Sequence, residues 1–230
     1  TGGARTRHPG SKTRGRGRSR PRNLGAPPRA RAPVREPAEQ RFLSALRALG
    51  NSLQEFGAPW LVIGGVAVIA AGVPRLTADI DATIWAPGTD PEALLDLLRI
   101  HRIVPRISDA ITFAKERQVL LVQHEPSGVP VDLSLAWLPF EEEAVRCGVE
   151  CDYAGVPIRL PRPEDLIIYK LVAARPRDLD DVEKLLLLYG GSLDIARIRR
   201  VIREFAEVLE DPARLEALER LLRATGLEHL

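Results

Sequence analysis

Residues 61–85, LVIGGVAVIAAGVPRLTADIDATIW, decide the fold of this chain. The stretch opens with LVI, a β-branched run that is typical of a buried strand. Gly64 and Gly65 follow, where the backbone has to turn sharply or approach a ligand closely. The small apolar residues 66–72 then predict a short packed helix. The N–H groups at the start of that helix would attract an anion, because the positive end of the helix dipole lies there.

The same stretch ends in a second predicted strand that carries two carboxylates. Residues 78–84, ADIDATI, alternate strictly, so Asp79 and Asp81 project from one face and the apolar side chains from the other. Positions two apart lie about 6.5 Å apart along a strand, and the two carboxylates repel each other unless a cation lies between them. A pair of divalent ions about 3.5–4 Å apart would fit that gap. A solvated Asp-x-Asp pair on an edge strand is the alternative interpretation.

Two glycines, thirteen residues and then Asp-Ile-Asp resemble the signature of the DNA polymerase β-like nucleotidyltransferase superfamily. Within that superfamily, GGVAVIAAGVPRLTADID is similar to the abortive-infection nucleotidyltransferases (AbiEii-like toxins) and their small relatives. Those proteins share an Arg-x-Thr-x-Asp-hydrophobic-Asp core, which reads RLTADID here.

Asp132 is the third acid that the superfamily's site requires. Residues 129–136 form a predicted strand after the turn signal EPSG, with apolar side chains on one face and Asp132 and Ser134 on the other. An acid flanked by apolar residues is unusual on a solvated surface, which favours a role in the site over a turn-proximal surface Asp. The role requires this strand to lie beside the strand of Asp79 and Asp81.

A second pattern, PEDLIIYKLVAARPRDLDD at residues 163–181, resembles another signature of the same relatives. In those proteins the helical lysine is thought to contact nucleotide phosphates, which implies that role for Lys170. A lysine that snorkels from a packed helix is the alternative. The pattern leaves open whether Arg177, Asp178 and Asp181 belong to the site or whether the two acids serve the start of the next helix.

The resemblance implies transfer of a nucleoside monophosphate from an NTP to a hydroxyl, with release of pyrophosphate. Two Mg²⁺ ions would be held by three catalytic carboxylates, those of Asp79, Asp81 and Asp132, the last also taking the acceptor proton. The nucleotide phosphates would be bound by backbone N–H groups and by charged or hydroxyl side chains, namely those of Gly64, Gly65, Arg75, Thr77 and Lys170.

The acceptor is the least determined part of this prediction. The family resemblance implies RNA, in particular the tRNA 3′ end, and with it a toxin that has a cognate antitoxin protein. A small-molecule hydroxyl, as in antibiotic-modifying nucleotidyltransferases, and a protein side chain are alternatives. A catalytically inactive nucleotide-binding module is another, but all three acids are present, which favours an enzyme.

Charge is distributed unevenly along the 230 residues. Residues 1–36 hold ten Arg and one Lys against one acid, a charge of about +10, while the remainder holds 22 basic and 30 acidic residues, or −8. Residues 1–37 have almost no apolar content, so we expect a disordered basic tail. An RNA-binding arm and an extension upstream of the true start are both open, and the lack of aromatic residues favours the second. An acidic body without that arm disfavours tight RNA binding.

Hydropathy and cysteine content argue against several classes of protein. The longest apolar run, residues 61–73, has thirteen residues and is too short to cross a membrane. The N-terminus lacks the apolar centre of a secretory signal. Cys147 and Cys151 have no partners for a zinc site or a disulfide framework. We therefore expect a cytoplasmic protein with two reduced thiols and no membrane partner.

The remaining patterns predict a small α/β fold with a mixed sheet of four to six strands. Predicted helices cover 38–56, 90–101, 163–175, 177–189, 193–210 and 212–224, a strand covers most of 111–123, and a hairpin covers 148–160. We expect a nucleotidyltransferase core with flanking helices over 38–160 and a helical C-terminal part over 161–230.

Overall fold

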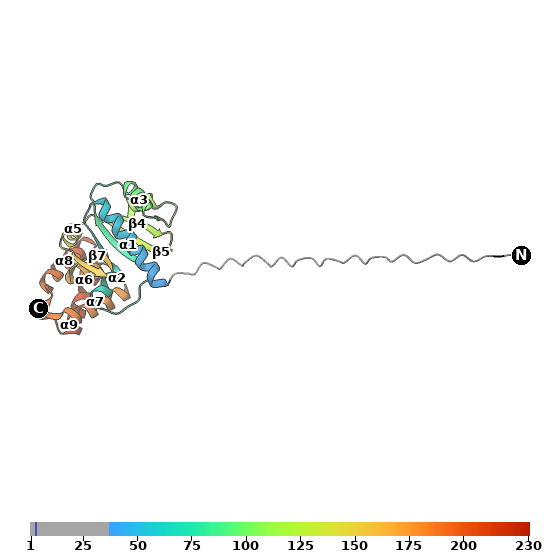
Figure 1. Cartoon of the computed structure of the whole chain (residues 1–230). Helices are drawn as coiled ribbons and strands as arrows, with labels where there is room; N and C mark the ends of the chain where they lie inside the picture. Colours follow the sequence, from blue (N-terminus) through green and yellow to red (C-terminus); the bar gives the residue numbers. More distant parts are fainter. Residues whose placement is uncertain (1–2, 4–36) are drawn as a thin grey trace. The chain divides into compact units, whose positions relative to one another are not determined.

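The computed structural model describes Gly3 and residues 37–230 (Figure 1). The predicted disordered tail therefore lies, except for Gly3 and Pro37, outside the described residues. Residues 37–230 form a five-stranded mixed sheet, a separate two-stranded hairpin and nine α-helices. The predicted α/β class with a helical C-terminal part is confirmed. The boundary between core and C-terminal part at residue 160 stays a prediction.

The central sheet has the strand order β1-β2-β5-β4-β3. In this order the strands are β1 (Trp60–Ile63), β2 (Ile80–Trp85), β5 (Val129–Ala136), β4 (Val119–His124) and β3 (Ile103–Pro105). One of the four pairs of neighbouring strands in this sheet is parallel. That parallel pair is β2 with β5, while β1 with β2, β5 with β4 and β4 with β3 are antiparallel. The two strands that carry the predicted acids are therefore direct neighbours.

One face of the sheet carries the main hydrophobic core. On this face Ala82, Leu133 and Leu120, from three neighbouring strands, are completely buried. They form one cluster with leucines of α1 (Ala38–Phe56) and α3 (Pro91–Ile100). Each buried leucine contributes about 1.5–3 kcal/mol relative to an exposed one. Because side chains alternate with a period of two, this packing also determines which residues project from the opposite face.

The opposite face is covered over only part of its width. Helix α5 (Pro139–Arg146) packs on β1 and β2 there, through a small cluster that includes Leu61 and Val145. On β5 and β4, the side chains of this face, such as Asp132 and Leu121, are only half-buried. The acids of the two central strands thus lie where the covered half of the face meets the more open half.

The C-terminal part consists of helices grouped around the C-terminus (Figure 1). They are α6 (Pro163–Ala173), α7 (Pro176–Tyr189), α8 (Ile195–Val208) and α9 (Ala213–Thr225), with a short 3-10 turn, η1 (Gly190–Ser192), before α8. Helix α2 (Gly64–Ala70) packs against both the sheet and α6. Throughout residues 37–230, every helix is too short or too polar to cross a membrane.

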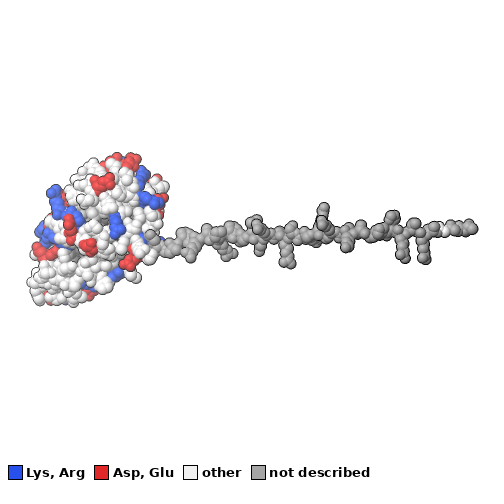
Figure 2. Space-filling model, viewed as in Figure 1, with Lys and Arg blue, Asp and Glu red and all other residues white. Residues whose placement is uncertain are grey.

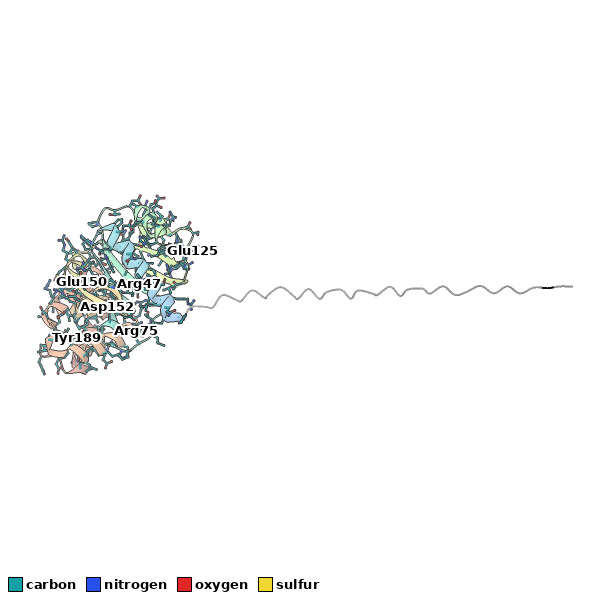
Figure 3. All side chains as sticks on the ribbon, viewed as in Figure 1. Arg47, Arg75, Glu125, Glu150, Asp152 and Tyr189 are labelled. Carbon is teal, nitrogen blue, oxygen red and sulfur yellow. The ribbon has the colours of Figure 1, made fainter. Side chains whose placement is uncertain are left out.

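Two polar contacts hold α7 beside the segment that follows α2. Arg75 pairs with Asp181 of α7. The Tyr189 hydroxyl, at the end of α7, donates a 3.1 Å hydrogen bond to the Ala71 carbonyl. Figure 3 labels Arg75 and Tyr189 on the side of the molecule where the C-terminal helices lie. Helix α7 is thereby held beside the segment between α2 and β2.

Several predicted elements are confirmed. Helix α1 has the predicted bounds, and Gly57 ends it in the left-handed conformation, with φ 78°. The predicted hairpin is present as β6 (Val149–Tyr153) and β7 (Val156–Leu160). Cys147 and Cys151 are free thiols, as expected.

The strand predicted over residues 111–123 is wrong in its first half. Helix α4 (Ala110–Arg117) occupies that half, and only β4 is extended. The β-branched residues at the start of this segment favoured a strand, but Ala, Lys, Glu and Arg close to them are good helix formers. Gln118, in the left-handed region with φ 55°, ends the helix and lets the chain turn directly into β4.

Candidate active site

The glycine pair begins helix α2 instead of preceding it. Gly64 has φ 61°, in the left-handed region, and a Cβ atom at this position would lie 1.9 Å from Oδ2 of Asp81. A Cβ atom on Gly65 would lie 2.5 Å from Oγ1 of Thr77. Glycine is therefore required at both positions, because any larger residue would clash with Asp81 or Thr77 where they pack against the start of α2.

The pairing of β2 with β5 brings two predicted acids together. Asp81 and Asp132 are direct partners in the parallel register, so their side chains leave the same face of the sheet. Asp79 lies just before the first residue of β2, so the strand is shorter than predicted. The Thr77 hydroxyl donates a 2.8 Å hydrogen bond to Oδ1 of Asp79 and orients that carboxylate.

The three acids create excess negative charge at this end of the strands. Burial raises the pKa of Asp81, and the negative charges of Asp79 and Asp132 raise it further. Burial likewise raises the pKa of Asp132, although the charge of Arg106 opposes the effect. Within residues 37–230 no ion pair involves Asp79 or Asp81, whereas Asp132 pairs with Arg106. Carboxylates in this situation favour the binding of an external cation.

Lys170 belongs to a buried network of ion pairs. Its Nζ atom lies 2.9 Å from Oδ1 of Asp178 and 3.0 Å from Oδ2 of Asp181, and its side chain is only 6% exposed. Arg75 also pairs with Asp181, and Nε of Arg175 lies 2.7 Å from Asp178. Burial alone would raise the pKa of Asp178, but the hydrogen bonds from Lys170 and Arg175 outweigh it and lower the pKa. The charges of this network compensate one another.

Asp178 serves the start of helix α7, but from inside the helix and not as its N-cap residue. Helix α7 begins at Pro176 with Arg175 as its N-cap residue, and Asp178 is the third residue of the helix. From there its carboxylate accepts a hydrogen bond from the backbone N–H of Arg175 at 3.3 Å. Asp181 has no cap contact, because its carboxylate is used by Arg75 and Lys170. The two acids join the turn between α6 and α7 to the approach to β2.

Acids and cations face one another across a common cavity of about 210 Å³. Its lining consists of the three acids of the strands and five charged residues around them, namely Asp79, Asp81, Asp132, Arg75, Lys170, Arg175, Arg177 and Asp178. Typical small-molecule pockets hold roughly 300–1,000 Å³, so this cavity fits phosphate groups better than a whole nucleotide.

Some predicted site residues lie behind the cavity. Gly64, Gly65 and Thr77 are outside its lining and instead support Asp81 and Asp79. Sequence reasoning missed Arg106, which no motif surrounds, and gave no role to Arg175 within the second pattern. The register of the strands would have been needed to place Arg106 beside Asp132. The position at which α7 begins would have been needed to place Arg175 beside Asp178.

Comparison with known proteins gives a family and a fold. The family model described as "Nucleotidyltransferase of unknown function (DUF6036)" matches residues 43–221. No curated protein matches the chain. The solution structure of the antibiotic-resistance factor ANT(2″)-Ia is 20% identical, with a TM-score of 0.52, and the match covers 75% of this chain and 95% of that one. JHP933 from Helicobacter pylori is 16% identical, with a TM-score of 0.47 and coverages of 85% and 93%. The first similarity shows a shared fold, and the second is too distant to carry an argument.

Proposed function

We propose that this chain, which belongs to the family of nucleotidyltransferases of unknown function (DUF6036), transfers a nucleoside monophosphate from an NTP to a hydroxyl group. The observation that carries this proposal is the register that pairs Asp81 with Asp132, beside Asp79. These acids face basic side chains across the cavity, which is the charge distribution that metal ions and a triphosphate together would complement.

Two Mg²⁺ ions are the cofactors whose ligand preference matches the chemistry of these three carboxylates. Nucleotidyltransferases with this acidic core generally use divalent metals, and carboxylate oxygens are the ligands that Mg²⁺ prefers. The raised pKa of Asp81, caused by burial and by Asp79 and Asp132, indicates a negative charge in need of a cation. Asp79 and Asp81 would hold the ions, with Asp132 as a further ligand. Bound Mg²⁺ would stabilise the negative charge that develops on the transferred phosphoryl group.

Each reacting group has a proposed partner in the chain. The acceptor oxygen forms a bond to the α-phosphorus, the bond from that phosphorus to the bridging oxygen breaks, and pyrophosphate leaves. Asp132, whose pKa is raised by burial, would take the proton of the acceptor hydroxyl. Arg75 would contribute to phosphate binding from the lining of the cavity, and Gly64, Gly65 and Thr77 would support the site from behind it by positioning Asp81 and Asp79.

The basic side chains that line the cavity differ in how accessible they are to a bound nucleotide. The side chain of Arg175 is 74% exposed, and its pKa is raised by Asp178 and then by Asp81 and Asp79, so it lies within electrostatic reach of the acids. Arg175 and the neighbouring Arg177 would therefore meet the β- and γ-phosphates. Lys170 is buried and already paired, and it would act on the nucleotide by holding this region in place.

RNA, in particular the tRNA 3′ end, is the first acceptor that we propose, with a role as the toxin of a toxin–antitoxin pair. The RLTADID core, which resembles that of the AbiEii-like toxins, supports this acceptor. Figure 2 shows acidic and basic side chains interspersed on the face in view, without a continuous basic surface for RNA. A small-molecule hydroxyl is the second candidate, favoured by the fold shared with an antibiotic-resistance factor.

Transfer of label from four α-³²P NTPs, in the presence of Mg²⁺, tests the proposal. Total RNA, total protein and an aminoglycoside serve as acceptors in parallel. The Asp79→Asn/Asp81→Asn variant provides the inactive enzyme, and Asp96→Asn, at an exposed acid of α3, provides the matched control. Label in RNA that only the double variant loses is the expected result. Label in protein or in the aminoglycoside would show that the acceptor is not RNA. The absence of label from all three acceptors would overturn the proposed activity.

A further inference from the structure

Arg106 stands at the end of a row of residues that crosses the sheet at the level of the acids. Its backbone N–H donates a 3.1 Å hydrogen bond to the carbonyl of Leu121 on β4. Leu121 pairs with Asp132 on β5, and Asp132 pairs with Asp81 on β2. Strand pairing therefore holds the backbone of Arg106 at a defined distance from the acids, and its side chain reaches over β4 to pair with Asp132.

The Arg106–Asp132 pair is more exposed than the ion pairs of Lys170, and its carboxylate is itself exposed to a similar degree as its cation. The side chains of Arg106 and Asp132 are 30% and 38% exposed. The pairs of Lys170 with Asp178 and Asp181 have exposures of 3–6%. Exposed ion pairs are weak and open readily, whereas removing one partner of a buried pair leaves an uncompensated charge. The guanidinium on Asp132 is thus easier for a competing ion to displace than the buried Lys170 is.

The three acids are also unequal in their access to a new cation. Asp79 accepts a hydrogen bond from Thr77 and Asp81 packs against Gly64, and both leave oxygens for a metal ion. In the described residues, no group of three acidic, His or Cys side chains is arranged as a ready metal site. Asp132 is the third acid beside Asp79 and Asp81, and its carboxylate is paired with Arg106.

We propose that Arg106 is a positioning residue that occupies Asp132 in place of a divalent ion and gives it up when the ion binds. The guanidinium and the divalent ion compete for the same carboxylate oxygens, so the full set of metal ligands forms only after the pair opens. Because the backbone of Arg106 is hydrogen-bonded to β4, opening requires a change of side-chain rotamer and leaves the sheet intact. This inference rests on the proposed function for the nature of the ion.

Binding of Mn²⁺ to the full chain without nucleotide tests the competition, with free Mn²⁺ measured by electron paramagnetic resonance. Arg106→Gln removes the competing charge and keeps a polar side chain, and we expect about tenfold tighter binding of Mn²⁺. Arg106→Lys keeps the charge but loses the planar fork that matches a carboxylate, and we expect an affinity between the two.

Two further variants show whether the gain passes through Asp132. Arg102→Gln is the matched control, because Arg102 pairs with Glu125 at 3.2 Å beside the same edge of the sheet, and we expect unchanged Mn²⁺ binding. Figure 3 labels Glu125 on the side of the molecule away from Arg75. In Arg106→Gln/Asp132→Asn the carboxylate itself is absent, and the gain should disappear.

The results separate this inference from the proposed activity. Equal Mn²⁺ affinity in Arg106→Gln and the unchanged protein, or a gain that survives Asp132→Asn, overturns the competition. If Arg106→Gln fails to fold by circular dichroism, Arg106→Lys decides in the same way. Tighter Mn²⁺ binding without label transfer to any acceptor would overturn the activity and support the competition. Label transfer by the unchanged protein, without tighter Mn²⁺ binding in Arg106→Gln, would support the activity and overturn the competition.

Discussion

The two sides of the cavity carry charge in opposite ways. The sheet wall, formed by Asp79, Asp81 and Asp132, has acids that repel one another, and burial together with this repulsion raises the pKa of Asp81. The helix wall, formed by Lys170 and Asp178 with Asp181 packed behind them, is closely paired, and the pKa of Asp178 is lowered despite its burial.

This difference separates functional charge from structural charge. Acids that repel one another raise the free energy of the folded chain, which is the arrangement expected of a ligand-binding site and not of a purely structural one. A buried lysine between two carboxylates needs no ligand, because each charge already has its partners. Changes in the sheet wall should therefore remove activity while preserving stability. Changes in the helix wall should remove stability first.

Asp81→Asn should have the largest effect, on activity alone. We expect the rate of label transfer to fall on the order of 10²–10³-fold or more, because the neutral amide is a poor ligand for the metal ions of the transition state. Thermal stability should stay equal or rise, since the change removes repulsion from Asp79 and Asp132. Asp96→Asn is the control for both measurements. A large loss of stability in Asp81→Asn would place this acid with the structural charges.

Lys170→Met should have the next largest effect, on stability. It leaves Asp178 and Asp181 buried without their shared cation, and a broken buried pair costs about 3–5 kcal/mol. Urea unfolding measures the loss. Lys184→Met is the matched control, because Lys184 pairs with Asp180 of the same helix at 2.6 Å but is 46% exposed, and it should cost less than about 1 kcal/mol. Equal losses in the two variants would show that the helix wall contributes no more than a surface pair.

Sequence patterns predicted the contents of the sheet wall better than its assembly. The alternation in ADIDATI placed Asp79 and Asp81 on one side because strand periodicity is local. The pairing of Asp81 with Asp132 depends on a parallel register between strands that are distant in the chain, and two hydrophobic patterns alone do not specify it. Arg106 was missed for the same reason, since it reaches Asp132 across a third strand.

The helix wall shows a different kind of limit. The family resemblance implies a phosphate contact for Lys170, and the local pattern does not show that α7 folds back and places Asp178 and Asp181 around its Nζ atom. The glycines illustrate the opposite case. Gly64 was recognised as a position of close approach, but the atom that approaches it, Oδ2 of Asp81, comes from the neighbouring strand.

Thr77→Val tests how the sheet wall is oriented and should have a moderate effect. Valine keeps the shape of threonine but loses the 2.8 Å hydrogen bond to Asp79. We expect label transfer to fall about 10–100-fold, as for other residues that orient metal ligands, and Mn²⁺ affinity to fall with it. Thr77→Ser, which keeps the hydroxyl, should restore both. A Thr77→Ser variant as inactive as Thr77→Val would show that the methyl group, rather than the hydrogen bond, matters.

The pH dependence of stability should show the smallest effect and the clearest difference between the walls. The pKa of Asp81 is raised above its ordinary 3.8 by burial, Asp79 and Asp132, so the folded chain binds this proton more tightly than the unfolded chain. Its contribution to stability therefore falls as pH rises from 3.8 towards the raised pKa. The pKa of Asp178 is lowered below 3.8 by Lys170 and Arg175, so its contribution is present above 3.8 and is lost as pH falls through the lowered value.

Urea unfolding without divalent ions, compared between variants from about pH 3 to 7, separates these two slopes. As pH rises above 3.8, the free energy of unfolding of Asp81→Asn should increase relative to that of the unchanged protein. Asp178→Asn should be less stable than the unchanged protein above pH 3.8, and this difference in the free energy of unfolding should shrink as pH falls below that value. Added Mg²⁺ should remove the first difference, because a bound cation favours the ionised Asp81, and should leave the second unchanged. Parallel pH profiles in both variants would mean that the two walls hold their carboxylates alike, and the division into functional and structural charge would fail.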